Sequence, residues 1–213
     1  MVMEKLTYGR FVKMLGCAAS AITEAKDELT ELDSQIGDGD HGTTMVKVME
    51  TVKATAEGYQ GGDFKGMLSA VGMAVLNMGG GATVPLFGSL FSGMARAVPE
   101  GTTELTKEQL AEAFKSGEAR LLKFSKAPLG GKTMVDALTP AVAAFADYGG
   151  ADIAAALEAA RLAAHEGCMK TKDYVAHFGR AKNLGERALG IPDPGSVSVS
   201  IIFKAFAKSV AEE

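Results

Sequence analysis

Apolar residues recur at intervals of three and four along most of this 213-residue chain. This spacing places them on one face of an α-helix, and the helix-favouring residues Ala, Leu, Met, Glu and Lys are abundant. We therefore predict an all-α protein of about eight helices. The expected helices cover residues 7–31, 43–57, 64–78, 85–98, 106–124 and 133–148, a segment that begins at Asp152, and residues 196–210.

Several helix boundaries carry recognisable start signals. Pro85 suits the first turn of its helix, and residues 106–109 have the composition of a capping box. Thr133 with Asp136 is expected to cap the helix that follows. Three glycines at 79–81 interrupt two apolar helices, so we expect the backbone to approach another group closely there.

The last segment can be read in two ways. Residues 196–201 alternate with a period of two, which is typical of a strand, whereas Phe203, Ala207 and Val210 continue at helical spacing. We choose a helix, because a lone strand would have no neighbour to pair with. The chain contains no repeat, low-complexity tract or linker composition, so we expect residues 1–213 to form one domain.

Composition narrows the choice of partners. Hydrophobic residues make up 47% of the chain, which is enough for a core, and a net charge of -4 without a basic cluster argues against nucleic acid. No apolar run approaches the ~18 residues of a membrane span, and charged residues interrupt the N-terminus, so we expect no membrane association and a cytoplasmic location. Cys17 and Cys168 lie far apart in helical patterns and are expected to be free thiols.

Residues 33–44 form the most informative segment of the chain. Asp33, Asp38, Asp40 and His41 stand there among three glycines and several hydroxyl groups. Carboxylates this close repel one another unless a cation lies between them, and oxygen ligands favour Mg²⁺ or Ca²⁺ over zinc. The glycines allow backbone N–H groups to approach an anion, and a helix that starts near His41 would direct its positive end to the same place. The segment therefore predicts a metal-phosphate site that includes His41.

Other interpretations of these motifs are weaker. Residues 37–42 match the dinucleotide pattern G-x-G-x-x-G, but they follow a helix and no βαβ unit surrounds them. Helix capping needs one acidic residue rather than three, and the ligand spacing of an EF-hand is absent. Residues 130–133 resemble the end of a P-loop, yet Lys126 occupies the place of its opening glycine, and a glycine turn with a Thr cap is adequate.

Arg180, Arg187 and residues 193–195 form a second polar concentration. An arginine can clamp phosphate through its planar guanidinium, and Pro-Gly fixes a turn. A charged surface loop would have the same composition. The residues by themselves leave both interpretations open.

Four blocks of sequence, in this order, resemble the nucleotide-binding subunit family of dihydroxyacetone kinases, the DhaL family. They are residues 33–44, 80–88, 131–136 and 179–195, and the resemblance spans nearly the whole chain. It implies a closed barrel of about eight antiparallel amphipathic helices, with a nucleotide site in the loops at one end.

The resemblance also implies which residues form that site. Asp33, Asp38 and Asp40 would hold two Mg²⁺ ions that bridge the phosphates of ADP or ATP, and no residue of this chain would act as a nucleophile or base. The implied nucleotide pocket consists of His41, Gly42, Thr43, Thr44, Ala82, Thr83, Ser125, Met134, Arg180, Asp193, Pro194 and Gly195. Val84, Ser125, Gly131 and Asn183 depart from the family pattern, and none of them is a metal ligand.

The function implied by the resemblance is that of a phosphotransferase subunit. It would pass the terminal phosphoryl group to dihydroxyacetone or a related short-chain ketose held by a separate substrate-binding subunit. Two donors are compatible with this function: ATP that exchanges freely, or a phosphotransferase-system protein that recharges bound ADP. The alternative is a nucleotide- or lipid-binding regulatory module without phosphoryl transfer.

Overall fold

The computed structural model describes residues 2–211 and is dominated by helices, which confirms the all-α prediction. The helices are α1 Tyr8–Glu24, α2 Lys26–Ile36, α3 His41–Gly58, α4 Phe64–Leu76, α5 Thr83–Ala97, α6 Lys107–Ser125, α7 Val135–Asp147, α8 Ile153–Lys170 and α9 Pro194–Ala211. Two short strands, β1 Lys5–Thr7 and β2 Glu104–Thr106, and the 3₁₀ turns Thr171–Asp173, Ala181–Asn183 and Gly185–Ala188 complete the described elements.

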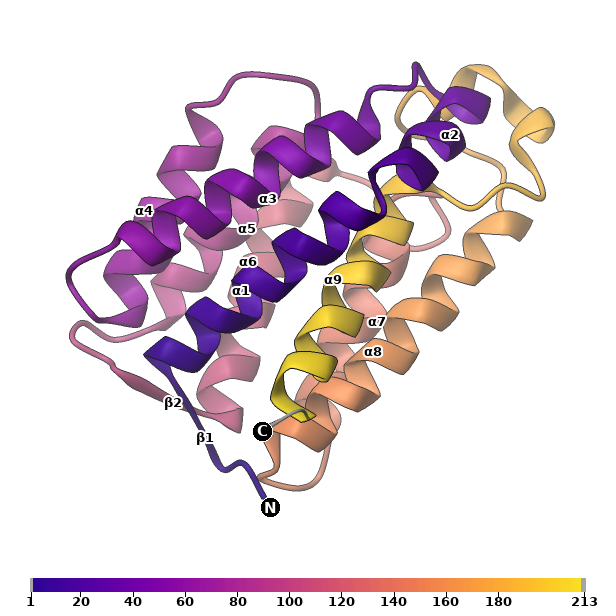
Figure 1. Ribbon diagram of the computed structural model, residues 1–213. Coiled ribbons are helices and arrows are strands. Elements are labelled where there is room, and N and C mark those ends of the chain that lie inside the picture. The colour runs from indigo at the N-terminus through magenta and orange to yellow at the C-terminus, as the bar shows by residue number, and fades with distance from the viewer. Residues whose placement is uncertain (1, 212–213) are drawn as a thin grey trace.

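The eight longer helices follow one another around a shared interior. α1 packs against α3, the contacts continue in chain order from α3 to α9, and α9 returns to α1 (Figure 1). Buried apolar side chains from every one of these helices form a single core cluster. In its centre Phe114 of α6 meets Phe145 of α7 and Phe203 of α9 at steep angles between the rings, an arrangement that aromatic rings favour.

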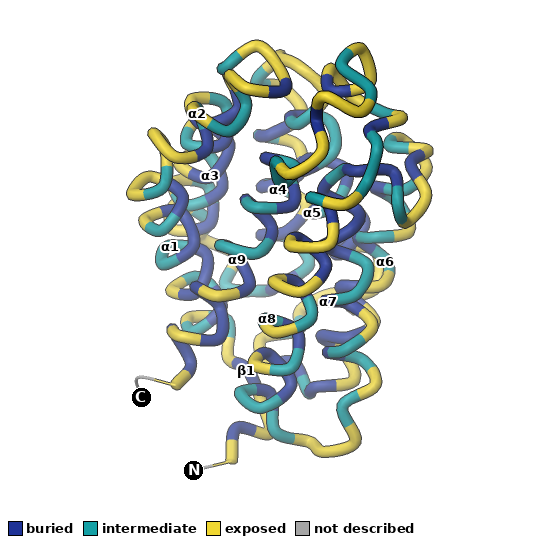
Figure 2. Tube along the Cα trace, turned by 90° about the vertical axis from the view of Figure 1, so that its right-hand side faces the viewer, coloured by how far each residue is buried: buried dark blue, intermediate teal, exposed yellow. Residues whose placement is uncertain are grey.

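The molecule has two different ends, which Figure 2 shows at the top and bottom of the tube. The terminal end carries the described parts of both chain termini, the two strands, and the connections 59–63, 98–106 and 148–152. The cleft end carries α2 and the connections 37–40, 77–82, 126–134 and 171–193. Because successive helices run up and down, α3, α5, α7 and α9 all begin at the cleft end.

The terminal end is closed by local hydrogen bonds. β1 and β2 pair antiparallel with Leu6 opposite Leu105, and both side chains are buried. Each helix that begins at this end has an N-cap side chain that accepts a backbone N–H: Thr7 from Arg10, Asp63 from Gly66, Thr106 from Gln109 and Asp152 from Ala154. The capping box predicted at residues 106–109 is confirmed.

The prediction of one continuous helix over residues 7–31 is wrong. The chain turns at Ala25, so that α1 and α2 are separate helices and the described residues contain nine rather than eight. The turn lets α2 pack against the start of α3. The two helices are so close there that any side chain at Gly42 would clash with the Lys26 carbonyl. Periodicity missed the turn because both helices are amphipathic. As a result, Asp33 lies in the last turn of α2 rather than beyond a helix.

Two further predictions concern the start of α7 and the conformation of the final segment. The N-cap position of α7 is Met134, one residue later than expected. Thr133 and Asp136 still bond at the start of this helix: the Thr133 hydroxyl accepts the Val135 N–H at 3.3 Å, and the Asp136 carboxylate accepts N–H groups from Thr133 and Gly130. The final segment is a helix, as predicted, whereas the three-residue strands are too short to give an alternating pattern. Among residues 2–211, no helix is both long and apolar enough to cross a bilayer.

Candidate functional site

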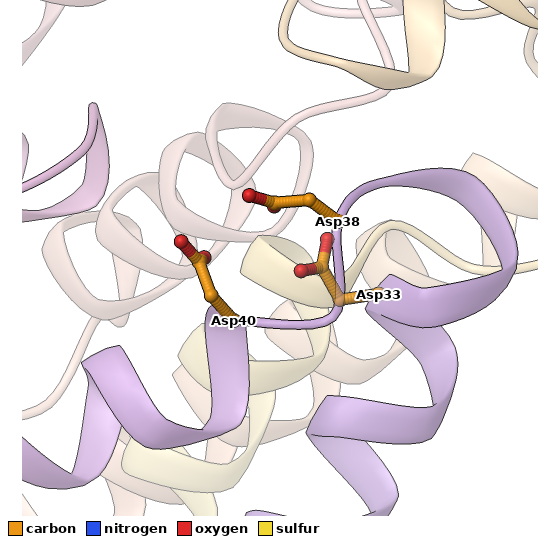
Figure 3. A group of neighbouring side chains, drawn as sticks. All are labelled: Asp33, Asp38 and Asp40. Atoms are coloured by element: carbon orange, nitrogen blue, oxygen red, sulfur yellow. The ribbon is translucent and has the colours of Figure 1, made fainter.

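The three predicted aspartates meet at the junction of α2 and α3. Asp33 comes from the last turn of α2, Asp38 from the connection, and Asp40 from the residue before α3, and their carboxylates point toward a common space (Figure 3). One oxygen of each lies within 4.8 Å of the others. The Asp33 carboxylate also accepts the His41 backbone N–H at 3.1 Å, which fixes the turn between the helices.

The chemistry of this group fits a hard divalent cation. It offers carboxylate oxygens and neither thiolate nor imidazole, which is the donor set that Mg²⁺ prefers. Arg180, from the connection between α8 and α9, places its guanidinium in an ion pair with Asp38. A positive group therefore already faces the carboxylates. Asp33, Asp38 and Asp40 are the residues that could hold a metal.

The carboxylates form one wall of a cleft of about 380 Å³ at the cleft end. Most of the predicted site residues line it: Asp33, Asp38, Asp40, His41, Thr44, Ala82, Thr83, Ser125, Met134, Arg180, Asp193, Pro194 and Gly195. Gly42 and Thr43 do not line this cleft, because Gly42 is buried against α2 and Thr43 faces solvent. Segments up to about 160 residues apart in sequence thus converge on one space.

Three helices open into the cleft without an N-cap side chain. The residues before α3, α5 and α7 are Asp40, Ala82 and Met134, and none of these side chains bonds to its helix. The positive ends of these helix dipoles therefore face the cleft, whereas several first-turn N–H groups already have acceptors: His41 in the Asp33 carboxylate, Val84 in the Gly81 carbonyl and Val135 in the Thr133 hydroxyl. α9 differs, because the Asp193 carboxylate accepts the Ser196 N–H at 2.7 Å.

A DAK2 domain model matches residues 35–208, which is most of the chain. This protein belongs to the DAK2 domain family. It is 36% identical to the ADP-binding subunit DhaL of PEP-dependent dihydroxyacetone kinase 2 from Listeria innocua, over 99% of both chains. It is 34% identical to the ADP-binding subunit DhaL of the PEP-dependent dihydroxyacetone kinase from Escherichia coli, over 97% of this chain and 99% of that one. The resemblance to the DhaL family is confirmed.

A solved structure shares the fold. The dihydroxyacetone kinase from C. freundii, crystallised with AMP-PNP and Mg²⁺, superposes with a TM-score of 0.74 at 24% identity. The match covers 93% of this chain and 33% of that chain, so the DAK2 domain described here spans about a third of the solved kinase.

Lys132 of the DAK2 domain is a structural residue of the site that the sequence did not reveal. Its side chain is 1% exposed, and its ammonium donates to the carbonyls of Thr171 at 2.5 Å and Ile191 at 2.7 Å. Burial lowers the pKa of Lys132, and the nearby carboxylate of Asp193 opposes this. Lys132 therefore ties the 126–134 connection to both ends of the 171–193 connection. A lysine beside a glycine turn gives no sequence signal of burial.

His41 joins two walls of the cleft. It is buried, and its Nε2 lies 2.8 Å from the Ser198 hydroxyl of α9, which in turn donates to the Pro194 carbonyl at 3.2 Å. Burial lowers the pKa of His41, and the Asp33 carboxylate partly opposes this. Ser198 was missed because its only sequence signal was the alternating pattern of residues 196–201.

Asp193 has an unusual carboxyl group. Burial raises its pKa to about 7; the Ser196 N–H and Lys132 oppose the rise, whereas Asp136 and Asp33 add to it. Its backbone N–H donates to the Thr171 hydroxyl at 2.9 Å, which holds the start of α9 against the end of α8. The DAK2 domain therefore keeps a partly protonated carboxyl group in the cleft near neutral pH.

Proposed function

We propose that this chain binds ADP or ATP together with two Mg²⁺ ions and serves as the phosphoryl-transferring subunit of a dihydroxyacetone-type kinase. A separate subunit would hold the acceptor, dihydroxyacetone or a related short-chain ketose. One observation carries the proposal: three converging carboxylates and the starts of α3, α5 and α7 line the same cleft. The names of the relatives that match along their full length, ADP-binding subunits, support it.

Each part of the cleft has a role in this proposal. Asp33, Asp38 and Asp40 would hold the metal, which supplies charge neutralisation for the phosphates when bound. The positive ends of the α3, α5 and α7 dipoles would stabilise the negative charge of the phosphates. Arg180 would leave Asp38 once a metal binds there, and its planar guanidinium would then be available to a phosphate oxygen.

The remaining residues would position the nucleotide. Met134, Phe87 and Phe124 also line the cleft and would offer an apolar wall for a base. His41 is buried and engaged with Ser198, so it would hold the walls together rather than accept a proton from the acceptor. Catalysis by this chain would thus consist of alignment and charge stabilisation, without a nucleophile.

We further propose that ADP stays bound and is recharged by a phosphotransferase-system protein. The relatives that match this chain along their full length are named PEP-dependent, or PTS-dependent in Lactococcus lactis. By contrast, the dihydroxyacetone kinase 2 from Saccharomyces cerevisiae, whose name mentions neither donor, is a longer protein, and this chain covers 35% of it. Turnover assays with the ketose-binding subunit should show activity with PEP and the phosphotransferase proteins. Equal turnover with ATP alone would contradict a resident ADP.

The metal assignment is tested by Asp38→Ala and Asp40→Ala. We expect each variant to lose at least 100-fold in Mg²⁺-dependent ADP affinity in calorimetry, because the remaining carboxylates cannot complete the ligand set. Asp147→Ala is the matched control, since Asp147 is an exposed aspartate at the terminal end. Full Mg²⁺-dependent binding by Asp38→Ala would contradict the assignment.

No observation favours the alternative of a lipid-binding module. The apolar space among the helices, lined by side chains such as Phe91, Phe114 and Phe203, measures about 40 Å³. This is roughly the room that one or two water molecules need. Native mass spectrometry of the purified protein should find ADP, and a stoichiometric lipid without nucleotide would overturn the proposal.

A further inference from the structure

The fold holds His41 at two points. Its backbone N–H donates to the Asp33 carboxylate at 3.1 Å, and its ring Nε2 lies 2.8 Å from the Ser198 hydroxyl of α9. His41 is 8% exposed, and Ser198 is fully buried. The first bond fixes the backbone and the second fixes the ring, so the imidazole has a defined direction. The two residues meet because α3 and α9 begin at the same end of the molecule.

The Pro194 carbonyl decides the direction of the hydrogen bond between His41 and Ser198. The Ser198 hydroxyl donates to this carbonyl, one helical turn back, at 3.2 Å, as serine commonly does within a helix. A hydroxyl has a single hydrogen, so Ser198 can only accept from His41. Hydrogen bonding to the Pro194 carbonyl also raises the pKa of His41, and a carbonyl oxygen cannot donate. The hydrogen of the neutral ring therefore lies on Nε2.

The other ring nitrogen of His41, Nδ1, is then a hydrogen-bond acceptor. No hydrogen bond to Nδ1 is found among residues 2–211, where Arg120 Nε is the one buried side-chain nitrogen or oxygen atom that lacks a partner. Nδ1 is therefore not sealed in the core. Because His41 lines the cleft, the Nδ1 lone pair is open to that space.

We propose that Ser198 is a positioning residue: it fixes the His41 imidazole so that Nδ1 accepts a hydrogen bond from an O–H group of the bound metal and nucleotide. This inference rests on the proposed function. The oxygens of an ionised phosphate are acceptors without a hydrogen, so they would not bond to the Nδ1 lone pair. Two kinds of O–H group are expected in such a cleft: the ribose hydroxyls, and the water molecules that Mg²⁺ usually keeps.

This direction gives His41 a role that differs from that of the positive groups in the cleft. Arg180 and the ends of the helix dipoles attract the negative charge of phosphate. His41 would instead select a hydrogen-bond donor and so set how the metal and nucleotide lie against α3. The bond needs only the lone pair of Nδ1. No proton moves to the ring, and His41 remains a binding group.

A contact that only ties α3 to α9 is the competing interpretation. Apolar side chains would make such a tie without the cost of burying a hydroxyl and an imidazole, as Val199 and Ile202 of α9 do in the core. Ser209 offers a matched comparison on the same helix. It is also buried, and its hydroxyl donates to the Phe206 carbonyl at 2.8 Å, at the terminal end. Ser198→Ala and Ser209→Ala thus each remove one buried hydroxyl, but only Ser198→Ala touches His41.

Nitrogen-15 NMR of the histidine rings tests the direction of the bond without metal or nucleotide. Spectra at pH 8, above the pKa of His41 that burial lowers, should show an unprotonated Nδ1 and a protonated Nε2, with the signals assigned through His41→Gln. In Ser198→Ala the two ring shifts should move toward each other, because both tautomers become populated. Ser209→Ala should leave them unchanged. A protonated Nδ1 in the unmodified chain would overturn the proposal, as would unchanged ring shifts in Ser198→Ala.

Calorimetry measures what the position of the ring contributes to binding. Ser198→Ala should bind ADP with Mg²⁺ about fivefold more weakly, which corresponds to the loss of one hydrogen bond. Ser209→Ala should bind with unchanged affinity. Urea unfolding should show similar losses of stability for both variants, since each loses a buried hydroxyl bond. Equal ADP affinities of Ser198→Ala and Ser209→Ala would contradict the positioning role.

Changes in the ligand identify the O–H group. If it is a ribose hydroxyl, 2′-deoxy-ADP or 3′-deoxy-ADP should bind Ser198→Ala and the unmodified chain with equal affinity. If it is water on the metal, magnesium pyrophosphate should lose about fivefold in Ser198→Ala, as ADP does. Equal losses for ADP and both deoxynucleotides, without a loss for magnesium pyrophosphate, would overturn the proposal. Absence of Mg²⁺-dependent ADP binding in the unmodified chain would contradict the proposed function alone, because the ring spectra are recorded without ligand.

Discussion

The helices that begin at the two ends of the molecule differ in their N-cap hydrogen bonds. At the terminal end, all four helices that begin there receive a hydrogen bond from an N-cap side chain. At the cleft end, three of the four helices that begin there receive none. Of the nine glycines with positive φ among residues 2–211, only Gly62 and Gly101 lie at the terminal end.

This difference separates stability from binding. Where a side chain caps a helix, the backbone N–H is satisfied locally and the helix end is stabilised. Where the N-cap side chain makes no such bond, the positive end of the helix dipole is open to an anion, and binding of that anion adds stability. The cleft end therefore depends on a few long-range contacts, of which Lys132 is the clearest.

The largest effect on the free energy of unfolding is expected from Lys132→Ala. The change leaves the Ile191 carbonyl without the Lys132 donor and the Thr171 carbonyl with the Tyr174 N–H alone, and a buried acceptor that loses its partner costs about 1–3 kcal/mol. We expect a loss of about 3 kcal/mol in urea unfolding, together with weaker ADP binding. Lys182→Ala, which changes an exposed lysine of the 171–193 connection, should stay within about 0.5 kcal/mol of the unmodified chain. An equal cost in both variants would show that the cleft end is not held by this contact.

A pH series sharpens the comparison, because carboxylates at the two ends should act with opposite sign. Burial raises the pKa of Asp193 to about 7, so the folded state holds more protons than the unfolded state, and the unfolding free energy falls as pH rises from 4 to 7. Gly66 N–H lowers the pKa of Asp63, so its contribution is lost as pH falls. Asp193→Asn keeps an oxygen for the Ser196 N–H and should remove this pH dependence.

The measurement is urea unfolding at pH 5 and pH 8 without metal or nucleotide. Relative to the unmodified chain, Asp193→Asn should gain on the order of 2 kcal/mol between the two pH values. Asp63→Asn, the matched change at the terminal end, should not show a gain of this sign. A pH profile of Asp193→Asn that is parallel to that of the unmodified chain would contradict the raised pKa.

The smallest effect is expected from Asp63→Ala at the terminal end. Loss of the N-cap of α4 should cost about 1 kcal/mol of unfolding free energy. Calorimetry should find Mg²⁺-dependent ADP binding unchanged, since Asp63 lies at the opposite end from the cleft. A loss of ADP affinity comparable to that expected for Asp38→Ala would contradict the prediction that residues at the terminal end do not affect binding in the cleft.

Local signals predicted much of the fold and part of the site. The carboxylates Asp33, Asp38 and Asp40 stand within eight residues, so their clustering was visible in the chain, and the structure brings them together. The turn at Ala25 was missed, because hydrophobic periodicity continues from α1 into α2. The start of α7 lies one residue later than expected, at Met134, although Thr133 and Asp136 form hydrogen bonds around it.

The sequence by itself determined what depends on near neighbours: helical periodicity, the capping box at residues 106–109, and the acidic segment at 33–40. Tertiary structure decided what depends on distant neighbours. His41 meets Ser198 across 157 positions, and Lys132 reaches Ile191 across 59. Burial and hydrogen-bond partners of this kind are set by how the helices pack around the shared core. No local pattern of residues encodes that arrangement.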